Sequence, residues 1–250
     1  MNIQVKWMKN NDCYKLSKPI TPCGVMVHST GANNPRISRY VSPTGWDKPN
    51  VTKAVHAFVG LLENGEVGCV QTLPWNIKGW HSGKGRNGES ANSMGYIGFE
   101  ICEDGLVDSK YFNAVYKMAV ELTAHLCKKY NLNPLEKGVV ICHSEGHQMG
   151  IASNHADVMH WFPLHGKSMD TFREDVAKTM KGRPLPKPAP VEVRDRYNRF
   201  EEIPAWGQPA VDRLIKAGKL KGSGAPFDKD GRPTDMNLSL DMLRLIVMFA

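Results

Sequence analysis

The sequence lacks the features that mark several classes of protein. None of its six cysteines forms a Cys-x-x-Cys pair, which argues against cysteine zinc knuckles and thioredoxin-like motifs. No stretch approaches the roughly 18 uninterrupted apolar residues of a membrane helix, and Arg244 interrupts the most apolar run, near Leu240 to Ala250. Residues 1–15 lack the apolar core of a secretory signal. We therefore expect a chain made in the cytoplasm, with most cysteines free and no membrane insertion.

The charges of the chain are not gathered into one block. Lysine and arginine number 32 against 25 aspartate and glutamate residues, a net charge of +7, yet no basic run of five or six residues occurs. Without a basic stripe or a known motif, this charge does not indicate nucleic-acid binding. With 41% hydrophobic and 23% charged residues over 250 positions, the composition is that of a soluble globular protein and excludes a disordered chain, a coiled coil or a collagen-like fibre.

A proline-rich segment divides the chain. Four prolines fall within residues 182–190, which favours an extended, semi-rigid spacer. We expect a body of residues 1–181 before it and a small module of residues 191–250 after it. A body of this length can bury a sizeable core without disulfide or metal staples.

Strand and helix patterns alternate along the body. Short apolar runs predict strands, an Asn-Gly pair predicts the tip of a hairpin, and apolar residues at three- and four-residue steps predict amphipathic helices. The expected strands are residues 24–28, 55–62, 67–71, 96–102 and 139–142, and the expected helices are residues 111–130 and 168–180. This order predicts an α/β fold, in which a mixed central sheet is flanked by helices.

Histidine is the residue that stands out. Five of the nine histidines fall within 23 residues: His143, His147, His155, His160 and His165. His28 and His143 each end a predicted strand, and Asp157 follows in a loop. Two histidines and a carboxylate suit Zn²⁺ and leave a fourth position open, as a catalytic site requires. His147 is an alternative second ligand, but His143 ends its strand directly, where the backbone is held more rigidly.

Six motifs occur in an order that resembles a known family. They are Val27-His28-Ser29-Thr30-Gly31 with the hairpin that contains His56, Val70-Gln71-Thr72-Leu73-Pro74, Gly79-Trp80-His81-Ser82-Gly83, Ile97-Gly98-Phe99-Glu100, Cys142-His143-Ser144-Glu145, and Asn154-His155-Ala156-Asp157. Over roughly residues 20–180 the chain resembles zinc-dependent N-acetylmuramoyl-L-alanine amidases of the amidase-2 group, which are related to peptidoglycan-recognition proteins. It is most similar to phage endolysins and other lytic amidases that act on Gram-positive walls.

The resemblance assigns roles to single residues. It places the ligands of one zinc ion per chain on His28, His143 and Asp157, and the catalytic glutamate on Glu100. Many members carry a lysine two residues before the third ligand, where it assists the oxyanion, and this chain has His155 there. An imidazole N–H can donate the same hydrogen bond. A second departure is that Val158 stands where proline usually follows the aspartate.

The reaction implied by the resemblance is hydrolysis of the amide between N-acetylmuramic acid and L-alanine of peptidoglycan. Glu100 would move the proton from water to the leaving amine, and His155 would stabilise the oxyanion. His56 and His81 would line the substrate groove, and Trp80 would stack on sugar or peptide. A lytic enzyme without a signal would reach the wall only after release, by a holin-type route or by lysis.

The module resembles a single S-layer-homology repeat. A segment that contains Trp206 leads into a predicted helix with Val211, Leu214 and Ile215 on one face, and Gly218 ends that helix. A second helix is expected to begin at Leu238-Ser239, with Ser239 as its N-cap. One such repeat buries little surface, so cell-wall binding and homodimerisation are both open roles for it.

Two other functions remain open for the whole chain. A peptidoglycan-binding protein without catalysis would share the fold, although such proteins lack a zinc ligand. An intracellular amidase that recycles soluble muropeptides would also need no signal, but the spacer and the additional module favour an insoluble wall as the target.

Overall fold

The computed structural model describes residues 3–182, 196–203, 208–222, 227–239, 242 and 246. The chain divides into two compact units, residues 1–191 and 192–250, and each is described by itself. All of the expected spacer except its first residue lies outside the described residues. None of the described helices has the length and apolar character needed to cross a membrane. All six cysteines are free, and five of them are buried.

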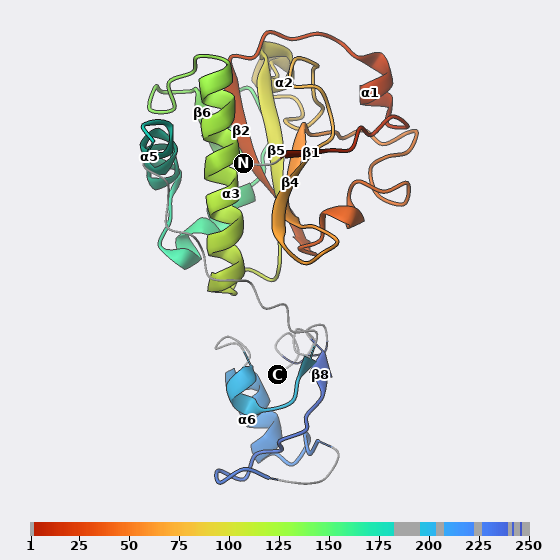
Figure 1. Ribbon diagram of the computed structural model, residues 1–250, viewed down its shortest axis with the longest axis vertical. Coiled ribbons are helices and arrows are strands. Elements are labelled where there is room, and N and C mark those ends of the chain that lie inside the picture. Colours follow the sequence, from red (N-terminus) through yellow and green to blue (C-terminus); the bar gives the residue numbers. More distant parts are fainter. Residues whose placement is uncertain are drawn as a thin grey trace. The chain divides into compact units, whose positions relative to one another are not determined.

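The first unit is built on a mixed six-stranded sheet, as predicted (Figure 1). In spatial order the strands are β1 (Ile3–Val5), β4 (Val67–Gln71), β3 (Ala57–Leu61), β5 (Tyr96–Glu103), β2 (Gly24–Asn33) and β6 (Val140–Cys142). Only the β3–β4 hairpin is antiparallel, and all other neighbours are parallel. The sequence analysis missed β1. This strand has only three residues, none of them buried, so it shows no alternation of apolar and polar side chains.

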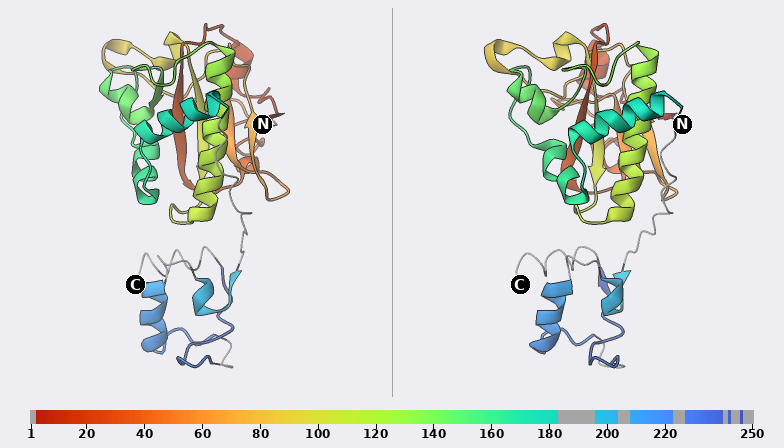
Figure 2. Two further views of the ribbon diagram at one scale, coloured as in Figure 1. Left: turned by 60° about the vertical axis from the view of Figure 1, so that its left-hand side comes forward. Right: turned by 90° about the vertical axis from the view of Figure 1, so that its left-hand side faces the viewer.

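One face of the sheet is covered by the two predicted helices. Helix α3 (Ser109–Lys129) begins at Asp108, whose side chain accepts hydrogen bonds from two backbone N–H groups of the first turn. Helix α5 (Met169–Met180) lies across α3 on the same side of the sheet (Figure 2). The main core lies between this helical layer and the sheet, and its strand members include Val25, Val27, Ala57, Val59, Ile97, Phe99 and Ile101.

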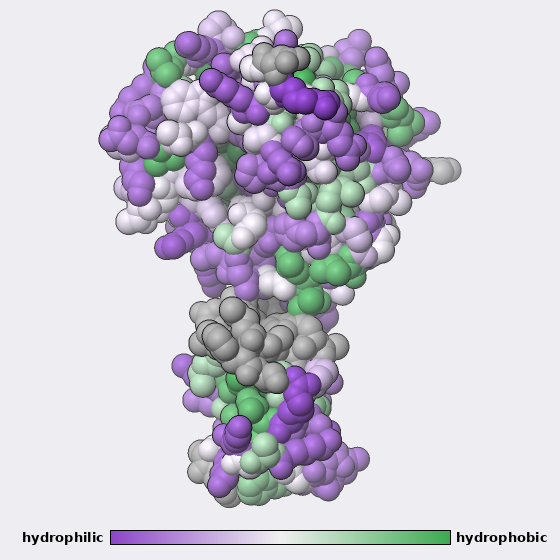
Figure 3. All heavy atoms as spheres, turned by 180° about the vertical axis from the view of Figure 1, so that it is seen from behind, coloured by the Kyte–Doolittle hydropathy of each residue, from purple (hydrophilic) through white to green (hydrophobic). Residues whose placement is uncertain are grey.

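The other face of the sheet carries the remaining strand residues. Side chains alternate along a strand, so His28 on β2 and Gly98 and Glu100 on β5 point away from α3. Seen from behind, the surface opposite α3 is mostly hydrophilic with small apolar patches (Figure 3). The short elements of this unit are α1 (Asp12–Leu16), η1 (Ile37–Arg39), η2 (Arg86–Gly88), α2 (Ala91–Met94), α4 (His143–Gln148), η3 (Asp157–His160) and η4 (Phe162–His165).

The second unit has a small core of its own. Strand β7 (Arg196–Tyr197) pairs antiparallel with β8 (Leu238–Ser239), and η5 (Phe200–Glu202) and α6 (Gln208–Lys216) lie between them in sequence. Among the described residues, the apolar cluster at its centre consists of Tyr197, Ile203, Val211, Met236 and Leu238.

The predicted helices of the second unit have different outcomes. The first is confirmed as α6, and Gly218 follows it in a left-handed conformation with a φ of +66°. The second was expected to begin at Leu238, which is wrong, because Leu238 and Ser239 pair with β7 as a strand. The Ser239 hydroxyl does accept a hydrogen bond from the N–H of helical Met242 at 3.1 Å, as an N-cap does. Trp206 lies outside the described residues.

Candidate active site

Three side chains from distant parts of the sequence meet on the polar face of the sheet. His28 lies within β2, which extends beyond the predicted end and changes register between Ser29 and Asn33. His143 begins α4 directly after β6, the neighbour of β2, and Asp157 begins η3. The two histidines are buried, with exposed fractions of 1% and 4%.

The three potential ligand atoms form a small triangle. Asp157 Oδ2 lies 3.2 Å from His28 Nδ1 and 3.0 Å from His143 Nδ1. The two Nδ1 atoms lie 3.2 Å from each other. Nitrogen and oxygen ligands lie about 2.0 to 2.2 Å from zinc, so in tetrahedral geometry they are separated by roughly 3.3 to 3.6 Å. The triangle is only slightly tighter than this, and its donor set therefore fits a divalent metal such as zinc.

The electrostatics of the triangle favour a charged Asp157 carboxylate beside a neutral His28. Burial alone would raise the pKa of Asp157, but the contacts of its carboxylate with the His143 and His28 rings outweigh burial and hold this pKa well below its usual range. Burial also lowers the pKa of His28, against the opposing influence of Asp157. A neutral imidazole and an ionised carboxylate are the forms that bind metals.

The loop that carries Asp157 is fixed by its neighbours. Asp157 has a φ of +46°, in the left-handed region that aspartate tolerates better than most residues. The next side chain, Val158, is fully buried in the main core. The departure from the family's proline at this position therefore leaves the loop anchored, by apolar packing.

Glu100 lies beside the triangle on the same face of the sheet. It pairs in register with His28 across the β2–β5 ladder, so the two side chains point the same way. Within the described part of the chain, Glu100 Oε2 is buried and has no hydrogen-bond partner. Burial, with the nearby charge of Asp157, raises the pKa of Glu100 well above its ordinary value, and Lys53 opposes that rise. A carboxyl group with a raised pKa in a polar site is suited to proton transfer.

His155 lies at the exposed side of the triangle. Its ring centroid is 4.7 Å from that of His143, and its Nδ1 lies 3.2 Å from Ser153 Oγ. Ser153 Oγ also lies 3.2 Å from His143 Nε2, so one hydroxyl touches both histidines. The sequence analysis missed Ser153, because a single serine carries no spacing signal.

The groove-lining role expected for His56 is wrong. His56 is fully buried, where the Gly98 N–H donates to its Nδ1 at 3.1 Å and its Nε2 donates to the Ile77 carbonyl at 2.7 Å. Burial lowers the pKa of His56 to about 4. His56 therefore holds the sheet to a neighbouring loop, as a neutral residue behind the site.

His81 and Trp80, which were expected to contact substrate, both contact other residues of the protein. His81 Nδ1 lies 3.0 Å from His28 Nε2, on the far side of that ring from Asp157. Trp80 is half-buried and packs against a small cluster that includes Met8 and Leu73. Contact of either residue with substrate remains a prediction.

The other histidines of the sequence cluster bind protein atoms outside the triangle. His147 Nδ1 lies 3.2 Å from the Ala152 carbonyl. Among the described residues, the group that could hold a metal is the triangle, and His147 does not belong to it. His160 Nε2 pairs with Glu103 at 3.1 Å. His165 Nε2 donates to a backbone carbonyl at 2.7 Å. His143 is thus the histidine of this region that reaches the triangle.

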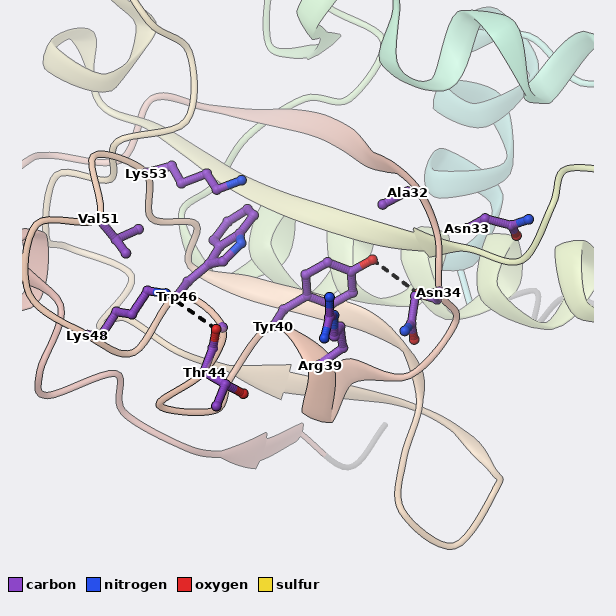
Figure 4. Close-up of a pocket in the computed structure, with 11 residues that line it drawn as sticks. Ala32, Asn33, Asn34, Arg39, Tyr40, Thr44, Trp46, Lys48, Val51 and Lys53 are labelled. Atoms are coloured by element: carbon purple, nitrogen blue, oxygen red, sulfur yellow. Dashed lines mark hydrogen bonds between the residues drawn. The ribbon is translucent and has the colours of Figure 1, made fainter. Parts of the chain in front are cut away.

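A cavity of about 590 Å³ lies beside Glu100 in the loops that follow β2 (Figure 4). Phe58 pairs with Glu100 across β3 and β5, and Tyr40 from the cavity wall stacks on Phe58 at 5.3 Å. The lining contains three cations and no carboxylate, and consists of Ala32, Asn33, Asn34, Arg39, Tyr40, Thr44, Gly45, Trp46, Lys48, Val51 and Lys53. Lys53 Nζ lies 4.4 Å from the centroid of the Trp46 ring. The sequence analysis missed this basic cavity, because its cations are not adjacent in sequence.

Comparisons with solved structures agree with this architecture. A hydrolase of Staphylococcus aureus, AmiA, solved with its ligand, is 19% identical, with a TM-score of 0.56 over 74% of this chain and 88% of that one. A mutant endolysin from Bacillus subtilis is 22% identical, with a TM-score of 0.51 over 70% and 99%. The catalytic domain of XlyA is 21% identical, with a TM-score of 0.51 over 70% and 99%. At these identities the likeness concerns the fold.

The sequence itself identifies the family. No curated protein matches the chain significantly. The profile of the amidase-2 family, described as N-acetylmuramoyl-L-alanine amidase, matches residues 18–160, which is more than half of the chain. This stretch includes the triangle of His28, His143 and Asp157 and the adjacent Glu100. The chain therefore belongs to the N-acetylmuramoyl-L-alanine amidase family of enzymes.

Proposed function

We propose that this protein is a zinc-dependent hydrolase that cuts the amide between the lactyl group of N-acetylmuramic acid and L-alanine, and thereby lyses Gram-positive walls as phage endolysins do. The observation that carries the proposal is the meeting of His28 Nδ1, His143 Nδ1 and Asp157 Oδ2 within 3.2 Å of one another, beside a glutamate whose Oε2 is buried. A non-catalytic binding protein would need neither that ligand set nor that glutamate.

The mechanism follows from the positions of the side chains. His28, His143 and Asp157 would hold one zinc ion, which supplies Lewis-acid chemistry by polarising a carbonyl and making water more acidic. Glu100 accepts a proton from the attacking water and delivers it to the leaving amine of L-alanine. His155, at the exposed side, donates an N–H to the carbonyl oxygen as negative charge develops there, in place of the family's lysine.

The basic cavity supports a direction for the substrate. The only carboxyl group of N-acetylmuramic acid is consumed in the scissile amide, so the glycan side of that bond is neutral. Stem peptides carry further carboxylates on the other side of the bond. A cavity lined by Arg39, Lys48 and Lys53 next to Glu100 suits the peptide side. The stem peptide would then enter the cavity while the glycan lies on the opposite side of the triangle.

Neutralising two of these cations should weaken substrate binding more than turnover. We expect the double substitution Arg39→Gln and Lys48→Gln to raise KM for a soluble muropeptide by about 2- to 30-fold, with kcat little changed, because exposed charge pairs each contribute about 0.2 to 1 kcal/mol. The matched control is Lys110→Gln with Lys128→Gln, which removes the same charge from α3 on the other side of the sheet. An unchanged KM, or an equal effect on muropeptides with amidated carboxyl groups, would contradict the proposal.

The proposed reaction is tested by following the bond that breaks. Purified peptidoglycan is digested with the full chain in ¹⁸O-labelled water, and the products are analysed by mass spectrometry. Hydrolysis of the amide places the label in the lactyl carboxylate and releases peptides with a free L-alanine amine. Release of reducing sugar ends, cleavage within the peptide, or binding without any product would each refute the proposal.

We propose that the second unit anchors the enzyme to the cell wall. Its separate core supports an independent role. Removing residues 183–250 should abolish sedimentation with intact walls while activity on soluble muropeptides is kept, because the proposed catalytic residues all lie in the first unit. Retained wall binding together with a halved mass in solution would instead assign the second unit to dimerisation.

A further inference from the structure

A chain of hydrogen bonds runs from His28 into the body of the protein. His28 Nδ1 belongs to the triangle, and its Nε2 lies 3.0 Å from His81 Nδ1. The other nitrogen of His81, Nε2, lies 3.2 Å from the Tyr96 carbonyl oxygen. The His28 and His81 rings meet edge to face, with centroids 5.1 Å apart.

The end of this chain fixes the position of each proton. A carbonyl oxygen can only accept, so His81 Nε2 must carry the proton that bonds to Tyr96. In neutral His81 the Nδ1 atom is then a bare acceptor, and His28 Nε2 must donate to it. His28 Nδ1 is consequently left without a proton, with its lone pair directed to the triangle. The Tyr96 carbonyl thereby selects the tautomer of a residue that it does not touch.

Two glycines, Gly98 and Gly79, leave space for the His81 ring. Gly98 lies inside β5, where glycine normally weakens a strand. A Cβ atom on Gly98 would lie 2.4 to 2.5 Å from three atoms of the His81 ring, and one on Gly79 would lie 2.8 Å from its Cδ2. The His81 backbone N–H also donates to Asn92 Oδ1 at 3.0 Å. The ring is therefore held flat against the strand by close packing.

We propose that His81 is a positioning residue that sets Nδ1 as the metal-binding atom of His28; this inference rests on the zinc site of the proposed function. His81 does not take part in the chemistry. On the other side of the triangle, His143 Nε2 lies 3.2 Å from the Ser153 hydroxyl, which donates to the Ser82 carbonyl at 3.3 Å.

Two substitutions separate the two hydrogen bonds of His81. Asparagine places its Oδ1 where His81 has Nδ1, so His81→Asn keeps an acceptor for His28. Glutamine places its terminal amide near the position of Nε2, so His81→Gln keeps a donor toward Tyr96 and loses that acceptor. We expect zinc affinity, measured on the full chain by competition with a chelator, to fall about 10- to 100-fold in His81→Gln, the usual effect of losing an outer partner of a metal ligand. His81→Asn should recover most of this loss.

The tautomers can also be read directly in the unmodified protein. Two-bond ¹H–¹⁵N spectra of the zinc-loaded chain should show His28 protonated at Nε2 and bound through Nδ1, and His81 protonated at Nε2 with a bare Nδ1. Equal zinc affinity in folded His81→Gln and in wild type, or a proton on His28 Nδ1, would overturn this inference alone. A wild-type chain that binds no zinc would overturn both this inference and the proposed function. Because the spectra are recorded on the wild-type chain, they test the tautomers of His28 and His81 even if the substitutions prevent folding.

Discussion

Replacing Glu100 with glutamine should lower the rate of amide hydrolysis by about 100- to 10,000-fold, the range that a positioned acid–base group contributes. Glutamine has nearly the same shape but cannot accept the proton of the attacking water. The Oε2 atom of Glu100 is buried, and the residue lies beside the triangle without belonging to it, so zinc should still bind. The measurements are the initial rate on a soluble muropeptide and the zinc content of the purified variant.

The control for this experiment is Glu136→Gln, which removes one exposed carboxylate from the loop that precedes β6 and should leave the rate unchanged. A Glu100→Gln enzyme that keeps one zinc and a near-wild-type rate would remove Glu100 from the mechanism. Loss of zinc together with loss of activity would show that Glu100 supports the metal, and the assignment as a base would then fail.

Replacing His143 with alanine should abolish both zinc binding and lysis. Two ligands would remain, one of them the carboxylate whose pKa is held low by its contacts with His143 and His28. Wild type should gain about 4 kcal/mol of stability when zinc is present at a thousand times its Kd, and the variant should gain none. Zinc content and the zinc-dependent shift in Tm measure the two effects. Chelation of wild type should reproduce the loss, and added zinc should reverse it.

The matched control lies one helical turn away. His147→Ala changes the same residue type on the same short helix, but His147 bonds to the Ala152 carbonyl and stands outside the triangle. It should keep zinc and activity. If His147→Ala loses zinc and His143→Ala keeps it, the ligand assignment must be exchanged between the two histidines.

The sheet and the meeting of the three residues could be predicted from the sequence for a clear reason. His28 and His143 each follow an apolar run, and the carboxyl ends of neighbouring parallel strands lie at one edge of a sheet. The order of the motifs added Asp157 and Glu100. The sequence could not show that β2 continues beyond His28, because the polar residues after it resemble a loop while they still pair with β5.

The supporting contacts of His56 and His81 could not be predicted, for a different reason. His56 and His81 sit in motifs close to the site in sequence, and a polar ring near a site is easily assigned to its surface. Their positions depend on Gly98 and on backbone carbonyls at Ile77 and Tyr96. Such partners are backbone atoms and carry no side-chain signal, so only the assembled sheet reveals that these two rings support the site from behind.

The separation of the triangle's members along the chain has a consequence for biosynthesis. His28 and Asp157 are 129 residues apart, and β2 must pair with both β5 and β6 before the triangle closes. Contacts between such distant segments form late, because the intervening chain must be ordered first. A ribosome-bound chain that has not yet extruded η3 therefore holds two histidines and no complete metal site. Binding of a metal at the triangle is thus expected to follow assembly of the first unit, as a late step of maturation.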